Sequence, residues 1–313
     1  MQKNRKKDSK RSNLSLLIRG RRLYAELVKK YKSVKTICIN QHPGLGDAFI
    51  SNLYLKQLND KDHYLITCIS NGSIEIFKNS GFVNIVKLTQ REIDELISYC
   101  HYMGIVKPDV WIMHHQALQW KTGIAWFFQG INGINFHDLM HAMVFPEFEK
   151  TRWEPLKCSK PLDLKENLAN SIILFPVSNT LYSPSEKLWD SIVSFLKSRG
   201  YDLYTYVFDG EKTINNTKSI KCNLSELVNL VEASAGVVAV RNGLVDVFAG
   251  ANCKKMILYP NYGAESWING SILNYWSINA FGFSNDAIEV EYSSSLEKIE
   301  DDNILYSSFI DEF

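Results

Sequence analysis

The sequence predicts an α/β protein of two domains, each built on a parallel sheet, that face each other across a cleft. Apolar runs typical of buried strands alternate with helical patterns along most of the chain. Two of these runs, Thr36–Asn40 and Gly236–Val240, lead directly into glycine-containing turns that open helices. Open parallel sheets bind their ligands at such turns. A length of 313 residues also favours two domains over one.

We place the first domain at residues 36–160. Its expected strands are 36–40, 64–69, 82–87 and 108–113. Its expected helices are 48–58, 73–79 and 91–101. The last of these follows Thr89, a capping residue, with Glu92 near the helix start. Residues 116–150 are aromatic and interrupted by glycine, and we expect helices or loops there that face the cleft.

The second domain is expected at residues 161–285, after a polar linker around 157–170. Its expected strands are 171–177, 202–208, 219–222, 236–240 and 255–259. Its expected helices are 185–198, 226–234 and 244–251, the second of them capped by Ser225. Residues 286–313 are acidic with scattered apolar positions, which indicates a closing helix and an acidic tail.

Residues 1–35 form a basic head in front of a mildly acidic body. They hold 13 of the 35 Lys and Arg residues but only two of the 34 acidic residues. The charged run Lys3–Arg11 precedes an amphipathic stretch with helical spacing of its apolar residues. This pattern fits attachment to an anionic membrane surface, nucleic-acid binding, or a basic tail with a helix packed on the first domain. We expect no nucleic-acid partner and keep the other two alternatives.

The cysteines, the apolar runs and the N-terminal residues indicate the cellular compartment of the protein. The six cysteines are scattered without a C-x-x-C pair, which favours reduced core thiols over disulfides or a zinc site. No apolar run is long enough to cross a bilayer, and the N-terminus does not resemble a signal peptide. We therefore expect a cytoplasmic protein, peripheral to the inner membrane face if the basic head binds there.

The order of several short motifs resembles the heptosyltransferase-like glycosyltransferases, a bacterial surface-polysaccharide type with the GT-B fold. The motifs are, in chain order, Gly46-Asp47 before the helix Ala48–Leu58, then Leu174–Asn179, Lys187–Trp189, Leu224–Leu227 and Val237–Gly243. The resemblance covers about residues 36–260 and implies two Rossmann-like domains, the first on the acceptor side and the second binding a nucleotide sugar.

One motif departs from the heptosyltransferase pattern. Those enzymes have Asp-Thr-Gly-Leu before a His, whereas this chain has Arg241-Asn242-Gly243-Leu244 before Asp246. An Arg at this turn is similar to fucosyltransferase-type and other surface-polysaccharide transferases of the same fold. The resemblance thus implies transfer of a sugar from a nucleotide-diphosphate donor to a glycan or lipid-linked acceptor. It also implies inversion, no catalytic metal and no cofactor besides the donor substrate.

The resemblance implies that Asp47 is the catalytic base that takes the proton of the acceptor hydroxyl. The alternative is that Asp47 only caps the following helix. On the same side of the cleft, Gly44 and Gly46 would let substrates approach the backbone. His42, His114 and His115 are further acceptor-side candidates.

The donor side of the predicted site is expected to bind phosphate. Arg241 would pair with the leaving diphosphate, supported by the amides of Gly243 and Leu244. The other donor-side candidates are Asn242, Asp246, Ser178, Asn179 and Lys187. Alternatives remain for several of them: Arg241 could form an internal salt bridge, Asp246 could pair with Arg241, and Ser178 and Asn179 could be ordinary turn residues.

Two other classes of function compete with a transferase. One is a nucleotide-sugar epimerase of the same fold, and the other is a non-catalytic, sugar-binding partner subunit. His137 and His141 have a spacing at which two histidines can bind zinc, but no third ligand accompanies them in a known pattern, so we predict no metal site.

Overall fold

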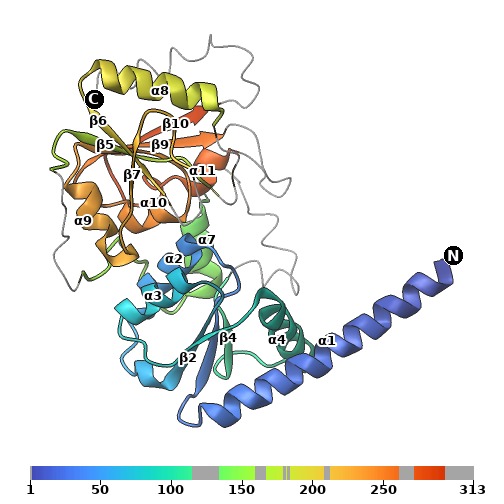
Figure 1. The fold of residues 1–313 in the computed structure, drawn as a ribbon. Coiled ribbons are helices and arrows are strands. Elements are labelled where there is room, and N and C mark those ends of the chain that lie inside the picture. Colours follow the sequence, from blue (N-terminus) through green and yellow to red (C-terminus); the bar gives the residue numbers. More distant parts are fainter. Residues whose placement is uncertain are drawn as a thin grey trace. The chain divides into compact units, whose positions relative to one another are not determined.

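The computed structural model describes residues 2–114, 134–158, 167–178, 181, 184–207, 212–260 and 271–292, with side chains from residue 14 onward. The chain divides into two compact units: Met1–Lys121 with Met143–Glu149, and Thr122–Ala142 with Lys150–Phe313. Each unit holds one sheet flanked by helices (Figure 1). Every pairing between described strands is parallel. The predicted α/β class with two parallel sheets is confirmed, and the cleft between the domains stays a prediction.

Unit 1 is built on a sheet of four strands in the order β3-β2-β1-β4. The strands are β1 (Thr36–Ile39), β2 (Tyr64–Cys68), β3 (Ile85–Lys87) and β4 (Val110–Ile112). The helices are α1 (Gln2–Lys30), α2 (Leu45–Leu55), α3 (Asn71–Asn79) and α4 (Gln90–Met103), with a 3-10 turn at Lys61–His63. α4 begins with the predicted capping box between Thr89 and Glu92.

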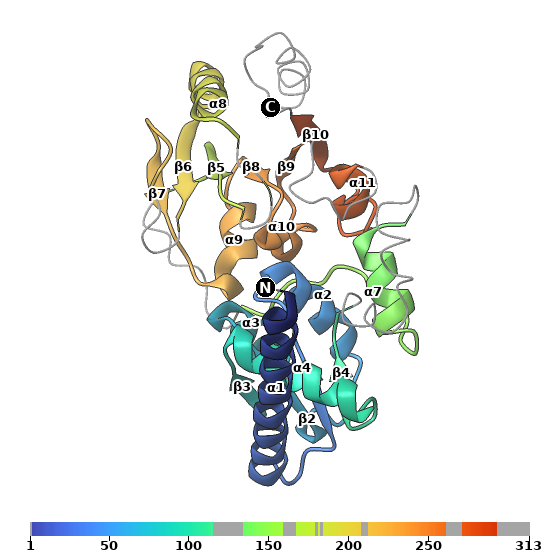
Figure 2. The same cartoon turned by 90° about the vertical axis from the view of Figure 1, so that its right-hand side faces the viewer.

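Helix α1 lies against α4, and the two helices run in the same direction. Arg19 pairs with Glu95, and the Tyr24 ring lies 5.8 Å from the Tyr99 ring. Further along, Leu27 joins Leu65 and residues of α4 in one apolar core. Figure 2 shows α1 along unit 1, with its amino end at the height of α2. The helix includes the basic run that the sequence predicts as a tail.

Unit 2 is built on a sheet of six strands in the order β10-β9-β8-β5-β6-β7. The strands are β5 (Ser171–Phe175), β6 (Asp202–Tyr206), β7 (Lys218–Ile220), β8 (Gly236–Val240), β9 (Lys254–Pro260) and β10 (Ile288–Tyr292). The helices are α8 (Glu186–Ser198), α9 (Leu227–Glu232), α10 (Gly243–Phe248) and α11 (Ile272–Trp276), with a 3-10 turn at Leu224–Glu226. Helix α7 (Phe136–Val144) begins in unit 2.

Unit 2 has one strand that the sequence does not predict, and one expected cap is wrong. Residues 288–292 form a strand that extends the sheet beside β9, at the start of the segment 286–313 for which a closing helix and an acidic tail are expected. Their alternation of apolar and acidic residues has the period of a strand, with Val290 and Tyr292 buried. The cap near residue 225 is Asn223, whose capping box with Glu226 opens a 3-10 turn. The rest of the segment expected as a closing helix and an acidic tail, residues 293–313, lies outside the described residues.

All six cysteines are free thiols, and Cys38, Cys68 and Cys100 are buried in unit 1. Burial raises the pKa of the Cys68 thiol to about 12, which keeps it protonated and unreactive. No described helix combines the length and the apolar character that crossing a bilayer requires.

Candidate functional site

The candidate acceptor-side site lies at the carboxyl ends of β1 and β4. The chain moves outward from β1 in both directions across the sheet, to β2 on one side and to β4 on the other. Open α/β sheets bind ligands at such a switch point, because the loops leaving the two strands diverge there. The loop after β1 carries His42, Gly44 and Asp47, and His114 follows β4 two residues after its end.

Three predicted residues meet at this point. Oδ1 of Asp47 lies 3.7 Å from Nε2 of His114, and the rings of His42 and His114 are 4.2 Å apart, edge to face. The Asp47 side chain is 24% exposed, whereas that of His114 is 5% exposed. Asp47 is therefore open to a ligand from one side and backed by a buried imidazole on the other. The two form an ion pair when His114 is protonated.

Gly44 gives the Asp47 carboxylate its space. Helix α2 begins after Gly44, and Asp47 lies in its first turn without acting as the cap. The alternative of Asp47 as the N-cap residue is therefore wrong. A Cβ atom at Gly44 would stand 2.6 Å from Oδ2 of Asp47, so any other residue would displace that carboxylate. Gly46 is buried in the same turn.

The donor-side candidates gather at the equivalent place in unit 2. The sheet order puts β5 next to β8, and the chain moves outward from this pair in both directions. Nδ2 of Asn242, after β8, donates a hydrogen bond of 2.7 Å to the carbonyl of Val177, after β5. Oδ1 of Asn242 accepts from the amides of Leu244 and Val245. Asn242 thus joins the two loops of the switch point and caps α10.

Arg241 and Asp246 form a buried pair within unit 2. Two guanidinium nitrogens of Arg241 donate to the Asp246 carboxylate at 2.6 and 3.1 Å, and Nε donates to the carbonyl of Trp276. The side chains are 6% and 3% exposed. Burial alone would lower the pKa of Arg241, but the Asp246 carboxylate, together with Tyr259 and Glu289, more than offsets this effect and raises the pKa. The pairing alternative is confirmed, and we assign Arg241 a structural role in place of the predicted phosphate contact.

The remaining predicted donor residues have different surroundings. Ser178 accepts a hydrogen bond from the amide of Leu181, the arrangement of a serine turn. Lys187 is exposed in the first turn of α8, which Ser185 caps. The amide of Leu244 donates to Asn242, so it is engaged within the helix start. Asn179 and His115 lie outside the described residues.

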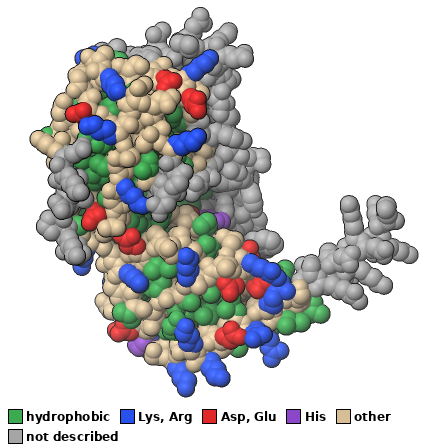
Figure 3. All heavy atoms as spheres, viewed as in Figure 1, with side chains coloured by type: hydrophobic (Ala, Val, Ile, Leu, Met, Phe, Trp, Pro, Cys, Tyr) green, Lys and Arg blue, Asp and Glu red, His purple; other side chains and the backbone are tan. Residues whose placement is uncertain are grey.

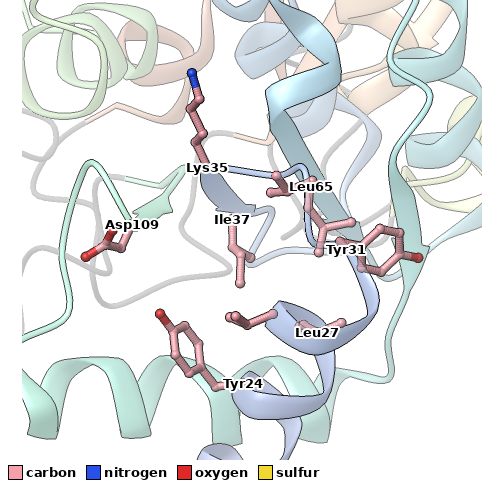
Figure 4. A pocket seen from close by; sticks show the side chains of 9 residues that line it. Tyr24, Leu27, Tyr31, Lys35, Ile37, Leu65 and Asp109 are labelled. Atoms are coloured by element: carbon pink, nitrogen blue, oxygen red, sulfur yellow. The ribbon is translucent and has the colours of Figure 1, made fainter.

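Two pockets in unit 1 lie away from this edge of the sheet. One, of about 160 Å³, lies under the end of α1, where Tyr24 and Leu27 face Ile37, Leu65 and Asp109 (Figure 4). The other, of about 250 Å³, lies at the start of β4 around Lys107 and Trp111. Both lie near the amino ends of strands, whereas parallel sheets bind their ligands at the carboxyl ends. We therefore leave both outside the candidate site.

His137 belongs to the core of unit 2. Its Nδ1 lies 3.3 Å from the carbonyl of Phe281, and its Nε2 lies 3.1 Å from the hydroxyl of Thr151. This pairing fits a neutral ring that donates from Nδ1 and accepts at Nε2. Among the described residues, no group of three His, Cys, Asp or Glu side chains could hold a metal ion.

The pairing of His114 with Asp47 was missed by sequence reasoning, although both residues were candidates. They are far apart in the sequence and meet because β1 and β4 are neighbours in the sheet. The link from Asn242 to Val177 was missed for the same reason. Knowledge of the strand order would have revealed both, because each contact joins the loops after two adjacent parallel strands.

Comparisons with known proteins support the fold. No protein-family model and no curated protein matches the chain. The E. coli heptosyltransferase WaaC, solved with ADP, is 10% identical over 88% of this chain and 99% of its own, with a TM-score of 0.54. The E. coli ADP-heptose LPS heptosyltransferase II is 13% identical over 88% of this chain and 98% of its own, with a TM-score of 0.53. At these identities the likeness concerns the fold, and it confirms the predicted resemblance at that level.

Proposed function

We propose that this chain is a glycosyltransferase that moves a sugar from a nucleotide-diphosphate donor to a hydroxyl of a glycan or lipid-linked acceptor, with inversion, in bacterial surface-polysaccharide synthesis. The observation that carries the proposal is the position of Asp47, a partly exposed carboxylate at the switch point of the first sheet. A fold shared with two heptosyltransferases, one of them solved with ADP, supports the donor class.

Asp47 acts as the base in the proposed reaction. Its carboxylate takes the proton of the acceptor hydroxyl while that oxygen attacks the anomeric carbon of the donor sugar. The bond from this carbon to the diphosphate oxygen breaks, and the nucleoside diphosphate leaves with the electron pair. His114 lies behind the carboxylate, at 3.7 Å, and holds it toward the acceptor.

The donor binds in this proposal at the switch point of the second sheet. Gly243 lets the donor approach the backbone, and Asn242 fixes the loop by its bond to Val177. Lys187, Ser178 and Asn179 are the proposed contacts of the diphosphate, with Lys187 supplying the positive charge that the leaving group needs. The reaction draws its sugar from the donor, needs no resident cofactor and proceeds without a metal.

The replacement Asp47→Asn tests the assignment of the base. It keeps the size of the side chain but removes its ability to take a proton. We expect transfer to fall by about 100-fold or more, the contribution typical of a general base. Binding of the donor should not change. The measurement is release of nucleoside diphosphate from a panel of nucleotide sugars with glycan and lipid-linked acceptors.

Asp62→Asn is the matched control, because this exposed carboxylate lies before the amino end of β2. Its activity should equal that of the unaltered chain. Unchanged transfer in Asp47→Asn would exclude Asp47 as the base. Conversion of a nucleotide sugar to an isomer without any acceptor would favour an epimerase.

Donor binding has a test that needs no acceptor. A ligand that binds only the folded chain stabilises it, by about 2.7 kcal/mol at a hundredfold excess over its Kd. Nucleoside diphosphates with different bases should therefore raise the Tm, and one base should have the largest effect. If none of them raised the Tm, the donor class would be wrong, and a non-catalytic partner subunit would be favoured.

A further inference from the structure

Helix α1 lies in a segment of unit 1 that is rich in Lys and Arg. Residues 1–35 hold 13 Lys and Arg residues against the two acids Asp8 and Glu26, while the remainder of the chain is acidic overall. Glu26 already pairs with Arg22. The segment therefore attracts a surface of negative charge, over a length of 29 helical residues.

One face of α1 is covered and the opposite face is open. The covered face approaches α4 so closely that a Cβ atom at Gly20 would lie 2.1 Å from the carbonyl oxygen of Glu95. On the open face Leu14 is 61% exposed and Ile18 is 60% exposed. The exposed residues Arg21, Arg22 and Lys29 continue this face. Figure 3 shows hydrophobic and basic side chains together at the lower right of unit 1.

The open face is thus a pair of large apolar residues followed along the helix by basic residues. We call this face the α1 surface: Leu14, Ile18, Arg21, Arg22 and Lys29.

We propose that the α1 surface docks on a bilayer that carries anionic headgroups. Interfacial helices bind in this way, with basic residues at the headgroups and apolar residues at the boundary of the acyl chains. The exposed Leu14 and Ile18 favour a bilayer over nucleic acid, because phosphate backbones are bound by charge and polar contacts. The proposal does not depend on the proposed transferase activity.

Co-sedimentation of the full chain with lipid vesicles tests this proposal. The protein should co-sediment at 0.1 M salt with vesicles of phosphatidylcholine that contain one third phosphatidylglycerol. It should not co-sediment with vesicles of phosphatidylcholine alone. Binding should weaken at 0.5 M salt, since added salt screens the attraction. The double replacement Leu14→Ser with Ile18→Ser should lower the vesicle affinity about tenfold or more, because it removes the apolar contribution.

Matched controls separate the surface from the rest of the chain. Val83→Ser changes an apolar residue that is 70% exposed on the same unit, outside α1, and should not affect binding. Arg21→Glu with Arg22→Glu should abolish binding, whereas Lys197→Glu with Lys212→Glu in unit 2 should not. The Tm of each variant confirms folding, since all of these side chains are exposed.

Several results would overturn the proposal. The proposal is wrong if the protein does not bind anionic vesicles, or if it binds vesicles of phosphatidylcholine alone equally well. It is also wrong if replacing Leu14 and Ile18 leaves the vesicle affinity unchanged. A labelled DNA duplex and a single-stranded RNA form a further arm of the test. Tight binding of either one that survives Leu14→Ser with Ile18→Ser would identify α1 as a nucleic-acid surface instead.

Discussion

Asp47 and Asp246 show how the surroundings of a carboxylate decide its use. Both lie in the first turn of a helix that follows a central strand. The Asp246 side chain is 3% exposed and bound to Arg241, so its charge is already neutralised inside unit 2. The Asp47 side chain is 24% exposed and borders a histidine at 3.7 Å. Of the two carboxylates, only Asp47 is partly exposed to solvent, which is why we propose Asp47 and not Asp246 as the base.

The buried pair leads to a prediction about stability. Arg241→Met leaves the Asp246 carboxylate buried without its partner, and such a loss typically costs about 3–5 kcal/mol. We expect a clear fall in Tm, measured by circular dichroism, and partial recovery in the double variant Arg241→Met with Asp246→Leu.

The same variants also distinguish a structural role of Arg241 from the phosphate contact that the sequence predicts. If Arg241→Met kept its Tm but lost affinity for nucleoside diphosphates, the phosphate contact would be correct and the structural assignment wrong. Lys197→Met is the matched control, because it removes an exposed cation of the same unit.

His137 makes the stability of unit 2 depend on pH. Burial lowers the pKa of this histidine to about 4, helped by the nearby Lys150. The unfolded chain, with an ordinary pKa of about 6.5, binds a proton that the folded chain does not bind. Stability is therefore full above about pH 6.5 and falls between pH 6.5 and 4, by on the order of 3 kcal/mol.

Urea unfolding at pH 7.0, 6.0 and 5.0 measures this dependence. His137→Gln should be less stable at pH 7 but should lose less stability than the parent on going to pH 5. His141→Gln is the control, since it lies one turn further along α7. If the free energy of unfolding changed with pH equally in His137→Gln and in the unaltered chain, His137 would not be the source of the pH dependence.

At the scale of elements, the contact between α1 and α4 depends on a single glycine. Gly20→Ala would place a methyl group 2.1 Å from a carbonyl oxygen of α4, so the two helices would have to separate. We expect a loss of about 1–3 kcal/mol, the usual cost of overpacking. Ala25→Leu, on the exposed side of the same helix, should leave the Tm unchanged. A Gly20→Ala variant as stable as the parent would show that α1 is not held against α4.

The elements themselves were largely predictable because local patterns determine them. β8 was expected at Gly236–Val240 and is observed there, since a run of buried apolar residues between turns has few alternatives. The Thr89 capping box was visible as two residues at a fixed interval. β10 was missed because its period-2 pattern was treated as part of an acidic tail. Residue 225 was expected as a cap although Asn223 offers the same chemistry two positions earlier.

At the scale of the whole molecule, the sequence predicted the class of fold but not the order of the strands. It placed candidate residues after β1, β4, β5 and β8, which is where both switch points lie. It could not show that His114 reaches Asp47, because that contact depends on β4 lying beside β1. Nor could it show that Arg241 is buried, since a charged residue at a glycine turn has the same pattern whether its partner is Asp246 or a ligand.

The proposed docking and the proposed transfer together predict a dependence on the acceptor. Leu14→Ser with Ile18→Ser should reduce transfer to an acceptor embedded in anionic vesicles by about tenfold, because less enzyme is bound there. Transfer to a water-soluble fragment of that acceptor should be unchanged. If both rates fell together, α1 would affect the catalytic unit itself. If neither fell, docking would have no bearing on the reaction.

The shared direction of α1 and α4 has a consequence for where this protein would work. α4 starts just after the carboxyl end of β3, and Gly20 of α1 lies against Glu95 of α4. The part of α1 that precedes residue 15 therefore extends past the start of α4, and so past the edge of the sheet that carries Asp47, by roughly 20 Å. A helix lying flat on a bilayer would then hold that edge at a fixed height, open along the plane of the lipids. Enzyme and acceptor would meet by diffusion in two dimensions, and turnover would follow the number of acceptors per unit area instead of their bulk concentration.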